Sequence, residues 1–297
     1  MEHYSIRDLE KLSGIKAHTI RVWERRYGIL PQHRTETNRR RYGDDELRRI
    51  INIAILHRNG FKISKIANFS GAEVEDKVSF LSKDTNRSDT QVDSVIMSMI
   101  DHNEKAVDTL LIRYILNRGI EDTFTDIVFP VLKRVGVMWH TGSADIGSEH
   151  FITNIFRQRI ISSIDSLSPV FKQGAKKVIL FLPDNELHEL PLLFFNYIIR
   201  KMGHETMYFG QSTPLLSVVN INNQWNADII ITDLMSEFPD INPSDFVSQL
   251  AKSFPMQKIL VAGVLADVSV KTKYKNVFPV RSQEDLKAHL EWKSHFP

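Results

Sequence analysis

The sequence predicts a multidomain chain of the α and α/β classes, with an N-terminal winged helix-turn-helix, a central four-helix bundle and a C-terminal doubly wound parallel sheet. Three observations predict this order. Short amphipathic helices joined by a glycine-containing turn open the chain, helical periodicity follows, and strand-like runs then alternate with helical runs after residue 169. The expected domains are residues 1–75, 92–170 and 171–297, with a linker at 76–91.

The composition excludes several classes of protein. A chain that is 42% hydrophobic and 25% charged is typical of globular proteins rather than disordered ones. The absence of cysteine excludes disulfides, thiolate metal sites, zinc fingers and cysteine nucleophiles. The longest apolar runs, such as 190–199, reach about half of the roughly 20 residues needed to span a bilayer. We therefore expect a soluble, cytoplasmic protein without a membrane partner.

Charge is divided unevenly along the chain. The formal net charge is +2, but residues 1–65 hold 15 Lys and Arg against 8 Asp and Glu, a net +7, which leaves −5 for residues 66–297. A basic module attached to an acidic body indicates that the first module binds a polyanion and that the remainder does not.

The elements of the basic module follow from its caps and its apolar spacing. Ser5 is the expected N-cap of a helix that ends at Ser13-Gly14, and a second helix spans residues 16–27. Residues 34–43 fit a β-hairpin wing, and a longer helix follows at 44–59. Residues 82–91 are polar and lack apolar periodicity, which is typical of a linker.

The remaining elements form a bundle and a sheet. Helical runs between residues 92 and 167 favour a four-helix bundle. The β-α-β alternation that follows predicts an open parallel sheet of the flavodoxin or Rossmann kind, whose ligands bind beyond the carboxyl ends of the strands. The expected strands are 178–182, 205–209, 228–232, 258–262 and 277–280, and the expected helices are 189–202, 214–223, 242–253 and 284–292.

Positive and hydrogen-bonding side chains gather on the second helix and on the expected wing. A DNA-binding helix needs both kinds, because phosphates supply affinity and base edges supply specificity. One such cluster is equally well explained by a solvated charged surface, but two clusters on a helix-turn-helix and its hairpin favour DNA. The candidates are His18, Thr19, Arg21, Arg25 and Arg26 on the helix, and Arg34, Asn38, Arg39, Arg40, Arg41 and Tyr42 on the wing.

The same residues carry a family resemblance. The runs Tyr4-Ser-Ile-Arg-Asp-Leu, Thr19-Ile-Arg-Val-Trp-Glu-Arg-Arg-Tyr-Gly and Arg39-Arg-Arg-Tyr resemble the N-terminal domain of the MerR family of transcriptional regulators, over residues 2–72. The resemblance implies that helix 16–26 enters the major groove, that 34–42 forms the wing, and that a dimer binds palindromic operator DNA. Many metal-sensing members of that family use cysteines, so the lack of cysteine excludes that mechanism here.

Two further segments group residues that could contact a ligand. At a helix–loop–helix junction, four of them fall within twelve positions: Trp139, His140, Glu149 and His150. Glu186 and His188 follow the first expected strand, where an open α/β sheet places its ligand-binding loop. From the residues alone, a packed tryptophan with surface histidines and a hydrogen-bonded loop histidine remain alternatives to a binding site.

These segments resemble cobalamin-binding modules. Glu186-x-His188, followed by a helix and by Tyr208-Phe-Gly-Gln-Ser-Thr-Pro, is similar to the Asp/Glu-x-His-x-x-Gly signature of base-off, His-on cobalamin domains. The resemblance implies that His188 is the lower axial ligand of cobalt and that Glu186 polarises its imidazole. It implies further cofactor contacts at the positions of the family's Ser-x-Leu and Gly-Gly stretches, which are Thr232, Leu234 and Gly263 here.

The spacing of Trp139, Glu149 and His150 resembles the helical cap of the light-sensing, adenosylcobalamin-dependent repressors of the CarH/LitR type. The resemblance implies that these three residues enclose the adenosyl group and that His140 takes the upper axial site after photolysis. It also implies a homo-oligomer, dimer or tetramer, that releases operator DNA when light expels the adenosyl group. The expected function is a sequence-specific repressor controlled by adenosylcobalamin and light.

Two signature glycines are replaced, and the replacements leave other functions open. Pro191 stands at the glycine of the histidine motif, and Ala262 stands at the first glycine of Gly-Gly. One alternative is a MerR-type regulator with a degenerate cobalamin fold that acts without cofactor or through a regulatory protein partner. Another is a cobalamin-dependent methyltransferase or mutase module, but the DNA-binding head and the lack of a separate catalytic domain argue against an enzyme.

Overall fold

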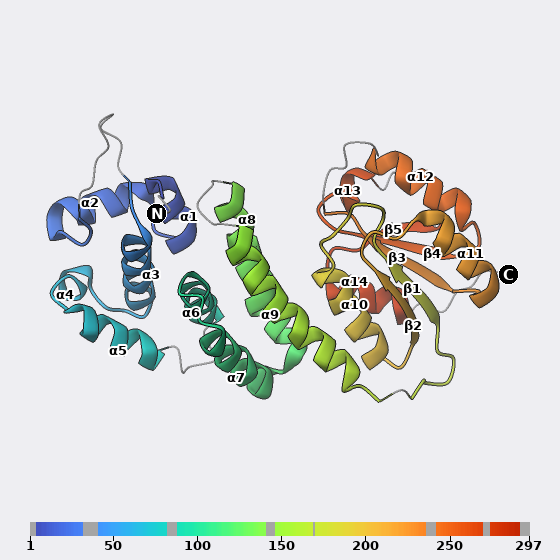
Figure 1. Ribbon diagram of the computed structural model, residues 1–297, viewed down its shortest axis with the longest axis horizontal. Coiled ribbons are helices and arrows are strands. Elements are labelled where there is room, and N and C mark those ends of the chain that lie inside the picture. Colours follow the sequence, from blue (N-terminus) through green and yellow to red (C-terminus); the bar gives the residue numbers. More distant parts are fainter. Residues whose placement is uncertain are drawn as a thin grey trace. The chain divides into compact units, whose positions relative to one another are not determined.

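The computed structural model describes residues 4–31, 41–81, 88–140, 146–168, 170–235, 242–269 and 274–291 (Figure 1). Residues 137–140 and 268–269 are described by their backbone alone. The chain forms two compact units, residues 1–156 and 157–297. The finer division into domains at 1–75, 92–170 and 171–297 stays a prediction.

The chain opens with the predicted helix-turn-helix. Ser5 caps α1 (Ile6–Ser13) reciprocally with Asp8, because the Ser5 hydroxyl accepts from the Asp8 amide and the Asp8 carboxylate accepts from the Ser5 amide at 2.7 Å. Gly14 ends this helix at a φ of +74°, which a residue with a side chain rarely adopts. The turn leads into α2 (Ala17–Tyr27), which ends at Gly28. The expected wing lies mostly outside the described residues, and its last residue, Tyr42, forms an antiparallel bridge with Tyr4.

Helices continue further into the expected linker than the polar composition indicated. After α3 (Asp44–Arg58) and the short α4 (Ile63–Ile66), α5 spans Gly71–Leu81 and α6 spans Ser88–Ile100. The expected linker at 76–91 is therefore helical at both ends, and its role as a linker stays a prediction. The reason at the second end is burial: Thr90 and Gln91 pack inside the N-terminal unit, although their side chains are polar.

The middle of the chain forms the predicted helical bundle. It consists of α6, α7 (Glu104–Thr123), the π-helical turn Phe124–Val128, α8 (Phe129–His140) and α9 (Ile146–Asp165). Gly119, with a φ of +84°, breaks the regular geometry inside α7. The apolar positions at helical spacing turn inward, so that Val95, Ile96, Phe124 and Val131 are buried.

The C-terminal unit contains a five-stranded parallel sheet in the order β2-β1-β3-β4-β5. The strands are β1 (Lys177–Phe181), β2 (Glu205–Gly210), β3 (Ile229–Asp233), β4 (Lys258–Ala262) and β5 (Val277–Pro279). Their bounds lie within a residue or two of the predicted ones. This order is the flavodoxin-like doubly wound arrangement, which confirms the predicted class and puts the switch point between β1 and β3.

Helices cover both faces of this sheet (Figure 1). On one face, α11 (Leu215–Trp225) and α12 (Pro243–Ser253) pack on a core that includes Phe181, Ile230 and Val261. On the other lie α10 (Leu190–Lys201) and α14 (Gln283–Glu291), and the short α13 (Ala266–Ser269) follows β4. Among the described residues, no helix is both long and apolar enough to cross a membrane.

Candidate functional site

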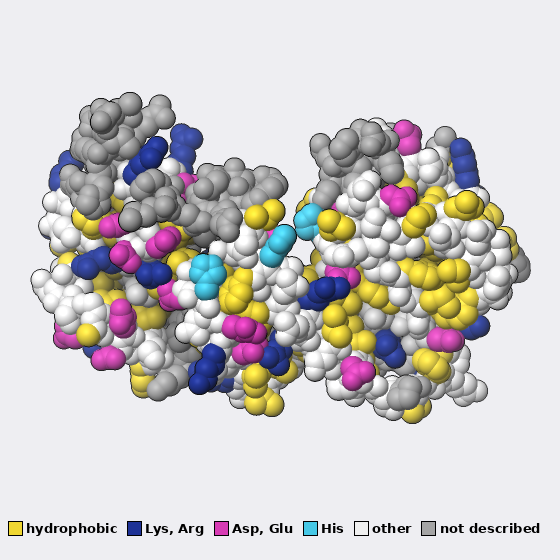
Figure 2. Space-filling view, viewed as in Figure 1, with side chains coloured by type: hydrophobic (Ala, Val, Ile, Leu, Met, Phe, Trp, Pro, Cys, Tyr) yellow, Lys and Arg dark blue, Asp and Glu magenta, His cyan; other side chains and the backbone are white. Residues whose placement is uncertain are grey.

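The second helix of the helix-turn-helix presents a basic surface. Ile20 and Trp23 turn inward and are buried, while His18, Arg21, Arg25 and Arg26 are exposed and Thr19 is half-buried. In Figure 2, Lys and Arg side chains gather on the side of the N-terminal unit where α2 lies. A helix held by its apolar side with several arginines outward has the geometry of a major-groove reader.

The wing candidates fall into two groups. Arg34, Asn38, Arg39 and Arg40 lie outside the described residues, and Arg41 is exposed. Tyr42 is only 2% exposed, and its hydroxyl donates to Glu24 of α2 at 2.6 Å. Its side chain therefore anchors the base of the wing to α2, which differs from the expected contact with DNA. The run Arg39-Arg-Arg-Tyr42 gave no sign in the sequence that the Tyr42 side chain is buried.

The four cap candidates flank the α8–α9 junction. Trp139 and His140 occupy the last turn of α8, where the backbone alone is described. Glu149 and His150 lie in the first turn of α9, with the His150 Nε2 atom 3.6 Å from a Glu149 carboxylate oxygen. Sequence reasoning missed His102, whose Nε2 atom lies 3.2 Å from the Ser148 hydroxyl and whose ring packs on Phe151. His102 thus links the α6–α7 turn to the start of α9.

A buried carboxylate organises the loop after β1. Glu186 is fully buried, and one of its carboxylate oxygens accepts from the backbone amides of Leu187 and His188 at 3.0 Å and lies 2.7 Å from His188 Nδ1. The other oxygen accepts from the backbone amide of Met235, after β3, at 3.1 Å. The sequence predicted that Glu186 and His188 belong together, and the structure brings them into direct contact.

These contacts orient the imidazole. The Nδ1 atom of His188 faces a carboxylate oxygen, so in the neutral form of the ring Nδ1 carries the proton and Nε2 carries the lone pair. The His188 side chain is 60% exposed although Glu186 beneath it is fully buried. A neutral imidazole held in this way by a carboxylate is the usual form of a histidine that ligates a metal.

Apolar side chains are exposed at the same edge of the sheet. Leu187, beside His188, and Val264, after β4, are both large apolar residues open to solvent. The loops that carry them are tied to the segment after β3, through Met235 on one side and through the Leu265 amide, which donates to the Leu234 carbonyl at 3.1 Å, on the other. The edge thus offers one imidazole among apolar contacts, which fits a large and partly apolar ligand.

Asp233, at the end of β3, was missed by the sequence analysis. Burial and the neighbouring Glu186 carboxylate raise the pKa of Asp233 to about 7. Within the described residues neither of its carboxyl oxygens has a hydrogen-bond partner, and the same is true of the hydroxyl of Thr232. In the sequence, the one sign of a buried carboxyl group here was an Asp at the end of the apolar run Ile-Ile-Ile-Thr-Asp.

The other predicted cofactor positions are divided between the core and the loops. Leu234 is buried in the hydrophobic core of the sheet, so its side chain serves packing. Gly263 has a φ of +93°, and a Cβ atom there would overlap both the Asp233 carboxyl and the Leu234 carbonyl. Glycine is therefore required at this position by the chain itself, whereas Ala262 is accommodated as the last residue of β4.

Pro191 is accommodated by the start of α10. It occupies the first turn of that helix, where a missing amide hydrogen costs little. The preceding Glu189 is nearly buried, accepts a hydrogen bond from the Tyr208 hydroxyl at 3.0 Å and pairs with Arg157 Nε at 2.5 Å. Burial, with the Glu189 carboxylate, raises the pKa of Tyr208. The histidine loop is thus held at both ends.

The donor set is unsuited to a bare metal ion. Across the described part of the chain, no three His, Cys, Asp or Glu side chains are grouped so that they could hold an ion. A single oriented imidazole is sufficient for a metal that arrives inside a macrocycle with its equatorial ligands already in place.

Two family models match the chain. The MerR HTH family regulatory protein model matches residues 4–71, and the B12 binding domain model matches residues 92–161. The second match covers α6 to α9 almost completely, which is the segment that carries the cap candidates.

Known proteins resemble most of the chain. The HTH-type transcriptional repressor CarH of Myxococcus xanthus is 26% identical over 217 residues, covering 71% of this chain and 72% of that protein. The repressor CarA of the same organism is 23% identical over 231 residues, covering 76% and 74%. The monomethylamine corrinoid protein of Methanosarcina barkeri shares the fold, with a TM-score of 0.55 and 13% identity over 69% of this chain and 99% of that one.

The exposed arginine face of α2 belongs to the MerR helix-turn-helix, and the oriented histidine belongs to the α/β unit. The chain therefore combines a MerR helix-turn-helix with a B12-binding domain and is homologous to the CarH and CarA transcriptional repressors.

Proposed function

We infer that this protein is a sequence-specific repressor whose operator binding and oligomeric state are controlled by adenosylcobalamin and light. The observation that carries the proposal is the Glu186–His188 pair, in which a buried carboxylate presents one exposed imidazole at the carboxyl edge of the sheet. Homology to two repressors supports a regulator rather than an enzyme.

The residues of the α/β unit fit the lower face of a corrinoid. His188 would be the axial ligand, Glu186 would keep its proton on Nδ1, and the exposed Leu187 and Val264 would contact the apolar ring. The hydroxyl of Thr232, which has no hydrogen-bond partner among the described residues, would bond to the nucleotide tail, since a buried hydroxyl without a partner is unfavourable. Gly263 would be required by its backbone conformation and its close neighbours whether or not the cofactor is bound.

The cap residues are proposed for the upper face. Trp139, Glu149 and His150 would enclose the adenosyl group, and His140 would be available as a later axial ligand. When bound, adenosylcobalamin supplies a metal–carbon bond that light can break. The protein's own task is to exclude water from that face and to respond when the bulky group is gone.

DNA binding would depend on how many DNA-binding heads, the N-terminal helix-turn-helix segments of the chains, are joined in one oligomer. Each head offers the exposed His18, Arg21, Arg25 and Arg26 and the half-buried Thr19, and a palindromic operator takes two heads. Because linked heads bind with high effective concentration, disassembly of a dimer or tetramer is sufficient to release the DNA.

One experiment tests the proposal directly. The full chain is purified in the dark with adenosylcobalamin, its visible spectrum and oligomeric state are recorded, and both are recorded again after illumination. The expected result is retained cofactor, a spectral change in light, a smaller assembly and weaker binding to a duplex that the dark protein has selected from a random library. Cofactor retention without any effect of light on assembly or DNA binding would contradict the light-controlled function.

A second function is favoured by the two replaced glycines. Pro191 and Ala262 stand where the family motifs carry glycine; Pro191 is half-buried in the first turn of α10, and Ala262 is buried at the end of β4. A regulator with a degenerate cobalamin fold would bind operator DNA without cofactor or through a protein partner. Failure to retain any corrinoid, with operator binding intact, would favour this alternative.

A further inference from the structure

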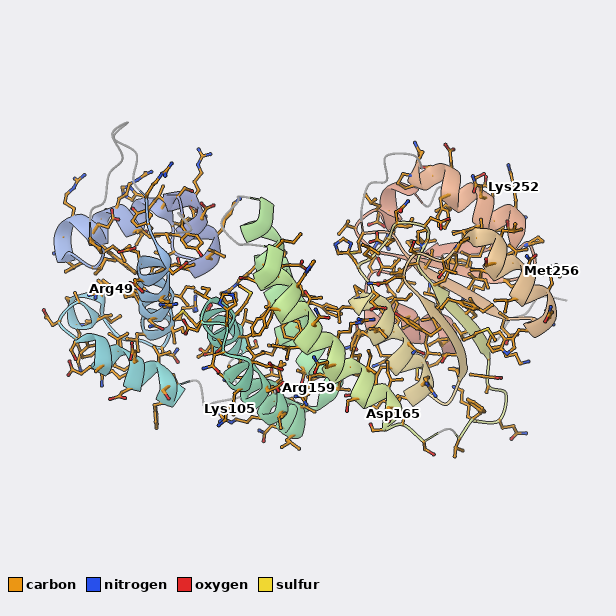
Figure 3. All side chains as sticks on the ribbon, viewed as in Figure 1. Arg49, Lys105, Arg159, Asp165, Lys252 and Met256 are labelled. Carbon is orange, nitrogen blue, oxygen red and sulfur yellow. The ribbon has the colours of Figure 1, made fainter. Side chains whose placement is uncertain are left out.

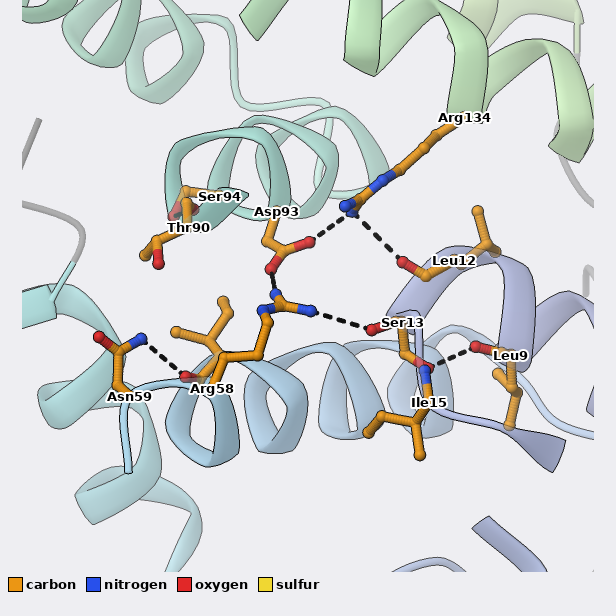
Figure 4. Close-up of polar contacts among 11 residues, drawn as sticks. Leu9, Leu12, Ser13, Ile15, Arg58, Asn59, Thr90, Asp93, Ser94 and Arg134 are labelled. Carbon is orange, nitrogen blue, oxygen red and sulfur yellow. Dashed lines mark hydrogen bonds and ion pairs between the residues drawn. The ribbon is translucent and has the colours of Figure 1, made fainter. Parts of the chain in front are cut away.

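Asp93 of α6 lies at the centre of an ionic cluster inside the N-terminal unit (Figure 4). Its side chain is 0% exposed, and its two carboxylate oxygens pair with two different arginines. Arg58 comes from the last turn of α3 in the DNA-binding head, and Arg134 comes from α8 of the bundle. One buried carboxylate therefore joins the head to the bundle.

Both arginines also hold the turn of the helix-turn-helix. Arg58 Nη1 donates to the carbonyl of Ser13 at 3.1 Å, and Arg134 Nη1 donates to the carbonyl of Leu12 at 3.3 Å. These carbonyls end α1, where no amide of the same helix is available to them. The next helix in the chain, α2, begins at Ala17 and carries the exposed arginines. The two arginines of the cluster thus hydrogen-bond to the C-terminal end of α1, directly before the turn that leads into the DNA-reading helix α2.

Asp93 is fully buried in this cluster, and the two arginines are half-buried. Burial lowers the pKa of Arg58 and of Arg134, and for Arg58 the nearby positive charge of Arg134 adds to that effect. A buried carboxylate is stable only while its charge is compensated. If the Arg134 contact is lost, Arg58 still compensates the charge of Asp93, but one carboxylate oxygen of Asp93 loses its partner and α8 loses its ionic link to the head.

The position of Arg134 relates this contact to the cap. Arg134 lies five residues before Trp139 on α8, about 7.5 Å along the helix axis. A ligand that shifts the end of α8 must also move Arg134, because both belong to one helix. Within the head, α1 also packs against α3, and both helices contribute buried apolar side chains, among them Leu9, Leu12 and Ile51.

We propose that Asp93 is the residue through which α8 sets the position of the DNA-reading head, with Arg134 as the moving partner and Arg58 as the fixed one. This proposal rests on the proposed function, since it assigns a route to the control of DNA binding by the cap ligand. Asp93 acts through the two arginines and is a positioning residue that does not itself contact DNA or cofactor.

The central test compares Arg134→Met with Lys133→Met. The two residues are neighbours on α8 and the substitutions remove the same charge, but Lys133 is exposed and Arg134 holds Asp93 and Leu12. Arg134→Met leaves the Arg58–Asp93 pair intact, so the head retains its fold. For each full-length variant, the affinity for the selected duplex is measured with and without adenosylcobalamin, in the dark and after light.

The expected result is a loss of coupling without a loss of either binding reaction. Arg134→Met should retain cobalamin and bind the duplex, but the effect of cofactor and light on affinity should fall from about tenfold or more to less than about twofold. Lys133→Met should behave like the wild type, and Arg134→Lys should restore part of the effect. Undiminished coupling in Arg134→Met would overturn the proposal.

A second measurement is independent of the cofactor. The chain has no cysteine, so Arg49→Cys on α3 and Lys105→Cys on α7 provide two unique sites for spin labels on exposed positions (Figure 3). The distance distribution between the labels should be narrow in the otherwise unchanged protein and in Lys133→Met, and broad in Arg134→Met. An unchanged distribution in Arg134→Met would also overturn the proposal.

The two measurements separate failure of this inference from failure of the proposed function. If the wild type retains no adenosylcobalamin, the proposed function fails and the link from cofactor to head fails with it. The spin-label distances then still decide whether Asp93 holds the head on the bundle.

Discussion

The DNA-reading face and the histidine loop use polar side chains in opposite ways. On α2, the arginines are exposed, and the affinity they supply for a polyanion increases with the number of positive charges. After β1, one imidazole is held by a carboxylate that also accepts three backbone amides, and its value lies in the orientation of a single nitrogen. A polyanion requires charge density, whereas a metal ligand requires a defined direction.

This comparison predicts the largest effect at His188. His188→Ala should weaken retention of adenosylcobalamin more than about 100-fold, because the loss of an axial ligand exceeds the effect of losing its outer partner. Retention is measured from the visible spectrum after gel filtration in the dark. The control is His289→Ala in α14 of the same unit. A His188→Ala protein that holds cobalamin as tightly as the wild type would remove His188 from the site.

The next effect is expected on α2. The double substitution Arg25→Ala and Arg26→Ala should weaken binding to the selected duplex by on the order of 100-fold and reduce the salt dependence, because two exposed charges near phosphates or bases are lost. Fluorescence anisotropy at several salt concentrations measures both quantities. Lys105→Ala, on α7, is the control for a lost surface charge. Equal salt slopes for the two variants would place the DNA elsewhere.

Glu186→Gln sharpens the comparison, because it preserves shape and removes charge. An amide has one acceptor where the carboxylate has two, so either the Met235 amide or the His188 ring loses its partner. Cobalamin affinity should fall roughly tenfold to a hundredfold, less than for His188→Ala. The same spectral assay checks the order. If Glu186→Gln retained full affinity, orientation by a charged partner would not be what the loop provides.

Asp233 predicts a smaller, graded effect of pH on stability. Its pKa is raised to about 7 in the folded chain, so the folded state binds its proton more tightly than the unfolded state. The stabilisation is present at low pH and decreases as pH rises from about 4 to about 7, by up to about 1.4 kcal/mol per pH unit. Asp233→Asn should flatten this slope in urea titrations of the cofactor-free protein. A slope that is the same in both proteins would show that the pKa of Asp233 is not raised in the folded chain.

Much of the fold was predictable, because its signals are local. The cap at Ser5, the glycine turn at Gly14 and the alternation of strands and helices after residue 169 are periodic or short-range features. The pairing of Glu186 with His188 was implied by the resemblance of this loop to the cobalamin-binding signature, whose acidic residue and histidine stand two positions apart. The helical ends of the expected linker were not predictable, because Thr90 and Gln91 are polar residues buried by distant parts of the unit.

The sequence by itself determined most of the helices and all five strands, the basic character of α2 and the spacing of the histidine motif. Only the tertiary structure decided that Tyr42 is buried, that Asp233 is enclosed with no hydrogen-bond partner in the described part of the chain, and that Asp93 joins α3 to α8. These features depend on residues that are 18 to 41 positions apart or on burial by several elements at once. Periodicity reports the local chain, whereas the partner of a buried charge is set by the way in which whole helices pack.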